Sequence, residues 1–190
     1  EGELFPTVAK TLKEQRDERK RSLIERCEKV VSLVDHKEPA VTWVQYNAEG
    51  DALESMIPGC VQVSGGDSDD VKEDRLTAFT SGDVRVLISK SRIAGYGLNW
   101  QHCGHQTFFP SHSYEQVYQS TRRSYRFGRT GPVQIDIVAT KAEEGVTVNL
   151  EKKRLKADLM FAALIQHMRA GQAIVTDERH VNPLEVPSWL

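Results

Sequence analysis

The chain has 190 residues, of which 39% are hydrophobic and 27% are charged, and its formal net charge is −2 at pH 7. This is an ordinary globular composition with enough apolar residues for one core. No apolar run approaches the roughly 20 residues that a membrane span needs, so we expect no membrane-spanning helix and no membrane partner.

The first residues and the cysteines indicate the origin of the chain and its cellular compartment. The first residues, EGELFPTVAK, show no signal-peptide pattern and no initiator Met, so we expect an excised or processed piece of a longer protein. The three cysteines, Cys27, Cys60 and Cys103, are far apart and form no CxxC. This spacing favours a reduced intracellular compartment over a disulfide-linked scaffold.

Charge is unevenly distributed along the chain. Residues 35–83 contain eleven acidic side chains and three basic ones, whereas residues 85–129 contain seven basic side chains and one acidic one, Glu115. A strongly positive segment predicts an anionic partner, either a phosphate or a nucleic acid, at the surface that this segment forms.

In chain order, residues 8–35 have a helical apolar pattern that becomes more amphipathic toward its end, so we expect a connector helix over residues 1–35. Buried-strand patterns alternate with helical patterns after it. The predicted elements are strands at 41–46, 60–63 and 84–89, a helix at 49–56, and a helix at 69–80 that begins after the N-cap Ser68 and ends at Gly82.

The alternation continues in the second half. A strand is predicted at 106–110, a helix that has Ser111 or Ser113 as its N-cap and ends near Gly128, and a strand at 133–138. Alternating strands and helices predict an α/β fold with a parallel sheet, helices on both faces and functional loops at the carboxyl ends of the strands, over residues 36–140. Residues 141–190 are predicted to form a C-terminal helix from about residue 146 or 150, followed by an irregular tail over the last twenty residues.

Residues 119–129, QSTRRSYRFGR, concentrate four arginines in one short segment. On a helix, Gln119, Arg123 and Arg126 would share one face, which would present an amide and two guanidinium groups. The simpler interpretation is a solvated surface run that compensates the helix dipole.

Residues 89–100, SKSRIAGYGLNW, directly follow the predicted strand 84–89. Glycines at 95 and 97 allow backbone amides to approach a ligand closely. A tight turn after a strand explains the same pattern when this segment is considered alone.

Considered together, the two segments resemble motifs V and VI of helicase superfamily two, and most closely those of the Swi/Snf-like ATPases, whose signatures are similar to STRAGGLGINL and QxxDRxHRxGQ. Residues 41–49, VTWVQYNAE, look like motif IV, and the resemblance covers about residues 41–138. Arg122 and Arg129 depart from the remodeller pattern and look more like bacterial or phage members. The sequence contains no GxxxxGK[ST] and no DE-x-H, so it resembles only the second RecA-like domain.

The resemblance implies roles for individual residues. Arg123 and Arg126 are expected to act catalytically as arginine fingers, with Gln119 beside them, on ATP and Mg²⁺ that a missing first RecA-like domain binds. Ser91, Arg92 and Gly95 are expected to contact nucleic-acid phosphates. Gly97 and Asn99 are expected to couple that contact to the nucleotide.

The predicted function is therefore that of the second motor domain of an ATP-dependent helicase or translocase. The expected substrate is DNA, with RNA as the alternative, and the piece itself is expected to be monomeric and inactive alone. It would act in the cytoplasm of a bacterial or phage-infected cell, or in the nucleus of a eukaryote. The alternative is a non-catalytic nucleic-acid-binding or protein-docking module of the same fold.

The histidines and the aromatic residues form weaker patterns, for which we expect mainly structural roles. His102, Cys103, His105 and His112 have the ligand types of a zinc site but no standard spacing, so no metal site is predicted. The remaining aromatic expectations are a core position for Trp43, a core or wedge role for Trp100, and helix packing or base stacking for Tyr114, Tyr118 and Tyr125.

Overall fold

The computed structural model describes residues 11–94 and 98–179, and the chain divides into two compact units, residues 1–150 and 151–190. The first unit contains a five-stranded sheet in the order β2-β3-β1-β4-β5, in which every neighbouring pair is parallel. Its strands are β1 (Ala40–Trp43), β2 (Val61–Val63), β3 (Val86–Ser89), β4 (His105–Phe108) and β5 (Gln134–Ile137). The parallel α/β fold is thus confirmed.

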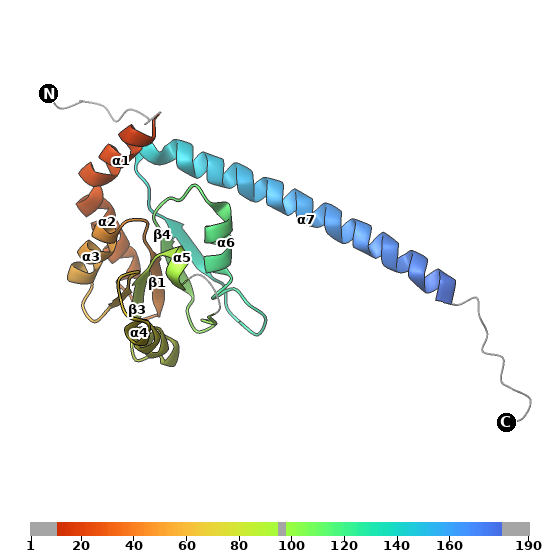
Figure 1. Cartoon of the computed structure of the whole chain (residues 1–190), viewed down its shortest axis with the longest axis horizontal. Coiled ribbons are helices and arrows are strands. Elements are labelled where there is room, and N and C mark those ends of the chain that lie inside the picture. Colours follow the sequence, from red (N-terminus) through yellow and green to blue (C-terminus); the bar gives the residue numbers. More distant parts are fainter. Residues whose placement is uncertain (1–10, 95–97, 180–190) are drawn as a thin grey trace, which may run out of the picture. The chain divides into compact units, whose positions relative to one another are not determined.

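Helices cover both faces of this sheet (Figure 1). One core joins the strands to α2 (Leu23–Val34) and α3 (Asn47–Met56), and the other joins them to α4 (Asp69–Ser81), α5 (Ser91–Ala94) and α6 (Tyr114–Thr121). Trp43 and Trp100 belong to the second core, both fully buried, and the Phe79 ring meets Trp100 edge-on at 5.3 Å. Both tryptophans are therefore core residues.

Local capping signals correctly predicted the limits of α4. The Ser68 hydroxyl accepts the N–H of Val71 at 3.4 Å, and Gly82 ends the helix with a φ of 88°. A left-handed residue after a helix satisfies the last carbonyl groups, and glycine adopts that conformation without Cβ strain. The local sequence alone was sufficient here.

The N-terminal helix is divided, which the apolar pattern did not predict. Ser22 separates α1 (Leu12–Arg21) from α2, and its hydroxyl donates to the Glu18 carbonyl at 2.7 Å. Cys27, Val30 and Val34 of α2 lie in the same core as the sheet. α2 is therefore a covering helix of this unit.

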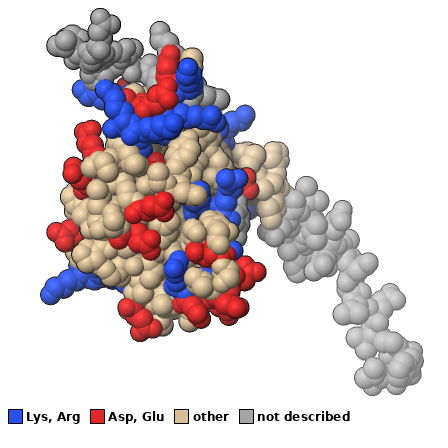
Figure 2. All heavy atoms as spheres, turned by 60° about the vertical axis from the view of Figure 1, so that its left-hand side comes forward, with Lys and Arg blue, Asp and Glu red and all other residues tan. Residues whose placement is uncertain are grey.

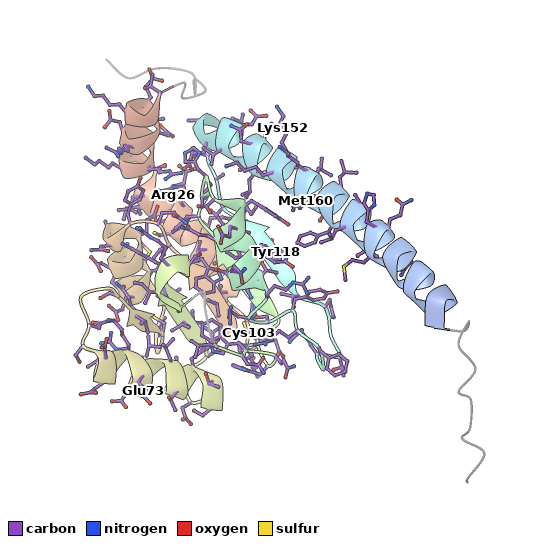
Figure 3. All side chains as sticks on the ribbon, turned by 45° about the vertical axis from the view of Figure 1, so that its right-hand side comes forward. Arg26, Glu73, Cys103, Tyr118, Lys152 and Met160 are labelled. Carbon is purple, nitrogen blue, oxygen red and sulfur yellow. The ribbon has the colours of Figure 1, made fainter. Side chains whose placement is uncertain are left out.

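The C-terminal helix, α7 (Glu144–Arg179), follows the short 3-10 turn η1 (Lys141–Glu143) and crosses from the first unit into the second. Val146 and Leu150 are buried in the first unit. In the second unit the helix continues to Arg179, so the prediction of an irregular tail from residue 171 is wrong as far as Arg179. Large apolar side chains of the second unit are exposed, namely Leu155, Leu159, Met160 (labelled in Figure 3), Phe161, Leu164, Ile165 and Met168.

No helix in the described ranges combines the length and the apolar character needed to cross a membrane.

Candidate nucleotide and nucleic-acid interface

Three adjacent strands, β3, β1 and β4, end at the same edge of the sheet because all are parallel. The loops that leave this edge lead into α5, α3 and α6 respectively, and α5 contacts α6. Lys90, Ser91 and Arg92 therefore lie at the carboxyl edge, where ligands bind in open α/β sheets. Residues 122–129 instead connect the end of α6 to the start of β5 and contact Gln101, which precedes β4, so they lie at the amino edge.

The loop after β3 presents a mixture of covered and exposed groups. Ser91, the first residue of α5, is only 4% exposed, whereas Arg92 and Asn99 are exposed. Lys90 Nζ donates to Asn47 Oδ1 at 2.6 Å and so ties this loop to the one after β1. Of the predicted phosphate contacts, Arg92 is open to solvent and Ser91 is largely covered. Gly95 and Gly97 lie outside the described residues.

The arginine segment does not form one long helix. α6 ends at Thr121, and the N–H of Arg126 donates to the Ser124 carbonyl at 3.1 Å, in a turn. Gln119 lies on the helix, whereas Arg123 and Arg126 lie beyond its end. The prediction that these three side chains share one helix face, on a helix ending near Gly128, is therefore wrong.

Gln106 of β4 accounts for the early end of α6. Its Nε2 donates to the Ser120 carbonyl at 3.3 Å and to Ser124 Oγ at 2.7 Å, while its Oε1 accepts from Trp43 Nε1 at 2.9 Å. A carbonyl near the end of a helix that finds a partner outside it stabilises the end at that point. This partner comes from a distant strand, so local helix propensity could not predict it.

Arg123 is turned inward and is only 9% exposed. Its Nη1 donates to the Leu98 carbonyl at 2.9 Å and its Nε to the Gln119 carbonyl at 3.3 Å. Its own carbonyl accepts the Trp100 N–H at 2.7 Å. Arg123 thus holds Leu98 and Trp100 at the end of α6.

Arg126 has the opposite environment. It is exposed, and within the described residues its guanidinium group has no hydrogen bond or ion pair. Phe127, the next residue, is fully exposed, and Gly128 turns the chain with a φ of 91°. Arg126 is therefore a cation that faces solvent on a short loop and has no partner among residues 11–94 and 98–179.

The other two arginines brace this loop. The Arg122 guanidinium lies over the rings of Tyr118 (labelled on α6 in Figure 3) and Tyr125, at 5.0 and 5.5 Å. Arg129 donates to the carbonyl groups of Gln101, Gly131 and Pro132. Arg122 and Arg129 hold the loop on both sides of Arg126.

The basic segment 85–129 therefore divides into two groups. Arg85, Arg123 and Arg129 donate to backbone carbonyl groups of this chain; Arg85 binds those of Val34 and His36, both at 2.7 Å. Their charges stabilise loops and are only partly available to a partner. The remaining cations are Lys90, Arg92, Arg122 and Arg126.

Two buried ion pairs at the exit of β1 were not predicted. Arg26 of α2 (labelled in Figure 3) binds Glu49 of α3 at 3.0 Å, and the two side chains are 3% and 2% exposed. Glu49 also accepts the N–H groups of Gln45 and Tyr46 at 2.8 and 3.0 Å. This pair orders the loop after β1, which carries the motif IV resemblance.

The second pair joins Arg19 of α1 to Glu143 of η1 at 2.6 Å, with side chains 9% and 0% exposed. Arg19 also donates to the Pro110 carbonyl at 3.0 Å and to the Tyr46 hydroxyl at 3.4 Å. These partners are 27 to 124 residues away. A sequence pattern of dense mixed charge on an amphipathic helix predicts solvated side chains and could not reveal them.

The histidine-rich segment 102–112 forms no group of three metal ligands within the described parts of the chain. His105 instead lies between His36 and Asp136, with nitrogen-to-nitrogen and nitrogen-to-oxygen distances of 2.7 Å each. Burial is the main cause that lowers the pKa of His36 and of His102.

The sequence matches no family model and no curated protein. Its structure is similar to that of the C-terminal part of the Fun30 ATPase domain, with a TM-score of 0.57 and 19% identity, over 67% of this chain and 45% of that one. It is also similar to the C-terminal domain of the DEAD-box protein Dbp5, with a TM-score of 0.55 and 16% identity, over 68% of this chain and 78% of that one.

A third structure, S. cerevisiae Dbp5 bound to RNA and ADP BeF3, gives a TM-score of 0.57 and 16% identity over 70% of this chain and 36% of that one. The chain has the RecA-like fold of helicase C-terminal domains. The RecA-like fold predicted from the sequence is thus confirmed. The chain spans about half or less of the Fun30 and RNA-bound Dbp5 structures.

Proposed function

We propose that this chain is the second motor domain of an ATP-dependent helicase or translocase of superfamily two, of the Swi/Snf-like type, acting on DNA. The observation that carries the proposal is the environment of Arg126. This exposed guanidinium lies without a partner among the described residues, on a loop that is braced by Arg122 and Arg129 and connects α6 to β5 of a RecA-like sheet.

The chemistry of phosphoryl transfer explains why a cation would be held there. Negative charge on the transferred phosphate is stabilised by a guanidinium group, which contributes about 10³ to 10⁵ in rate in other nucleotide hydrolases. Arg126 is available for that role because it is exposed and unpaired within the described residues. The phosphate cradle and the Mg²⁺ carboxylate would come from a first motor domain, since this sequence has no GxxxxGK[ST].

Arg123 would contribute differently. It is bound to the carbonyl groups of Leu98 and Gln119, so a direct contact with ATP requires those bonds to break as the two domains close. In the structure described here it positions the segment that contains Asn99. Both roles predict loss of hydrolysis in Arg123→Ala, but only the positioning role predicts loss of thermal stability as well.

The nucleic-acid contacts proposed at the carboxyl end of β3 are Lys90, Ser91 and Arg92. Such contacts act through phosphates, so they are independent of base sequence and weaken with salt. Gly95 and Gly97 retain the roles that the family resemblance gives them.

The test uses this chain together with its nucleotide-binding domain. Arg126→Ala should lower kcat for ATP hydrolysis about 10³-fold or more, while ATP binding changes little, because the charge develops chiefly in the transition state. Arg126→Lys should not restore the rate, since lysine lacks the planar fork.

Arg122→Ala is the matched control, because Arg122 is exposed on the same loop but stacks on tyrosine rings. It should lower kcat far less than Arg126→Ala does, because it weakens the bracing of the loop but keeps the Arg126 guanidinium group. Hydrolysis at the parent rate by Arg126→Ala would reject the proposal and favour a non-catalytic module.

A further inference from the structure

A recess of about 190 Å³ lies between α1, the start of α2 and the start of α3. Its lining includes Leu23, Ala48 and the ring of Tyr46, which is 41% exposed. Ligand pockets for whole small molecules occupy about 300 to 1,000 Å³, so this recess accommodates one ring-sized group rather than a complete cofactor.

Four charged residues also line the recess, and two of them are neutralised inside the protein. Arg19 is paired with Glu143, and Glu49 is paired with Arg26. The other two, Arg16 and Lys20, are exposed and have no ion-pair partner among the described residues. The recess thus combines an apolar floor with two positive charges at its rim, and Figure 2 shows Lys and Arg side chains gathered over α1.

The Tyr46 ring is held in a fixed position. Arg19 Nη1 donates to its hydroxyl at 3.4 Å, and the Arg19 guanidinium lies 5.7 Å from the ring centroid. The Tyr46 backbone N–H donates to Glu49 Oε2 at 3.0 Å. A fixed, partly exposed aromatic ring provides a stacking surface with little loss of side-chain entropy on binding.

The recess also adjoins the phosphate-binding loop proposed above. Asn47, the residue after Tyr46, accepts a hydrogen bond from Lys90, and Lys90 is followed by Ser91 and Arg92. A strand whose phosphates contact Lys90 and Arg92 can therefore reach Tyr46 along the same edge of the sheet. Stacked bases beside a cationic track are the usual arrangement for binding single strands.

We infer that this recess binds one unpaired base of a single-stranded nucleic acid, with Tyr46 against the base and with Arg16 and Lys20 at the flanking phosphates. The inference rests on the proposed nucleic-acid function and extends it to α1, which lies outside the segments that resemble helicase motifs. An unpaired base is required because the bases of a duplex are already stacked and paired.

The experiment is a fluorescence-anisotropy titration of the 190-residue chain with a labelled oligothymidylate and with an abasic oligonucleotide of the same length. Tyr46→Leu should weaken oligothymidylate binding about tenfold, which is within the range for loss of one base stack. It should leave binding of the abasic strand unchanged. Tyr46→Phe should bind as the parent does, since the ring remains.

Charge and shape variants give independent tests. Arg16→Gln and Lys20→Gln should each weaken binding to both oligonucleotides and lower the salt slope by about 0.7. Ala48→Phe, at an exposed position on the lining, should block the recess and weaken only oligothymidylate binding. Lys37→Gln is the matched control, because Lys37 is exposed but precedes β1 at the opposite edge, and it should change nothing.

Each result that would contradict the inference shows which part of the proposal fails. If Tyr46→Leu affects both oligonucleotides equally, or neither, the base-binding inference is overturned. If Arg92→Gln weakens binding while the Tyr46, Arg16 and Lys20 variants do not, this inference fails and the proposed phosphate contact stands. If the parent chain binds neither oligonucleotide, the nucleic-acid function fails with it.

Discussion

Replacing Arg26 by methionine tests the buried ion pair at the exit of β1. Methionine fills part of the same volume but leaves Glu49 as an unpaired, buried carboxylate, with a side chain that is only 2% exposed. Breaking a buried pair from one side costs about 3 to 5 kcal/mol. The N–H groups of Gln45 and Tyr46 still bind Glu49, so we expect a loss of about 3 kcal/mol, at the lower end.

The assay is urea unfolding followed by circular dichroism. The free energy of unfolding falls by about 2 kcal/mol per molar urea, so a loss of about 3 kcal/mol in that free energy lowers the urea midpoint by about 1.5 M. Arg21→Met is the matched control, since Arg21 pairs with Glu18 on the surface and its side chain is 65% exposed. That variant should shift the midpoint only slightly.

The double variant Arg26→Met, Glu49→Gln separates the ion pair from packing. It should be more stable than the sum of the two single losses predicts, because the unpaired carboxylate is gone. A cost for Arg26→Met no greater than that for Arg21→Met, or simple additivity in the double variant, would refute the assignment of the pair as an organiser of this loop.

Three further predictions follow from the same structure. Burial, together with the nearby His105 and Arg85 side chains, lowers the pKa of His36, so the unfolded chain takes up a proton that the folded chain resists. Thermal stability should therefore fall as the pH drops through about 6.5, the ordinary histidine pKa, and His36→Gln should flatten that slope. Burial raises the pKa of the Cys27 thiol to about 11, so a thiol reagent at pH 8 should label half-buried Cys60 first and reach Cys27 only after unfolding in urea. A plot of log affinity against log salt for a single-stranded oligonucleotide should have a slope of about −3 if Arg16, Lys20, Lys90 and Arg92 all contact phosphates, and a slope near zero would exclude phosphate contacts.

The order and type of the sheet elements could be predicted because their signals are local. The strands at 84–89 and 41–46 are short, mostly apolar runs rich in β-branched residues, and they correspond to β3 and β1 within a few residues. Ser68 and Gly82 marked α4 correctly because each acts on the nearest turn of the backbone.

The site could be predicted only in part, because distant contacts determine it. Helical spacing placed Arg123 and Arg126 on one face, but the Gln106 amide stabilises the end of α6 before either residue. Every arginine also carries the same charge, so the sequence alone does not show which arginines are bound within the protein. Only the tertiary contacts distinguish Arg123, which is bound to carbonyl groups, from Arg126, which is exposed.

The position of Gln106 determines how the loop that carries Arg126 can move. Both N–H groups of its amide are engaged, by Ser120 and Ser124, and its oxygen holds the indole of Trp43 in the centre of the sheet. The segment that leads to Arg126 is thereby fastened to two central strands, and close-packed interiors deform little. Arg126 would then move together with the sheet. A rotation of the whole domain, and not a bending of the loop, would bring its charge to the nucleotide or remove it.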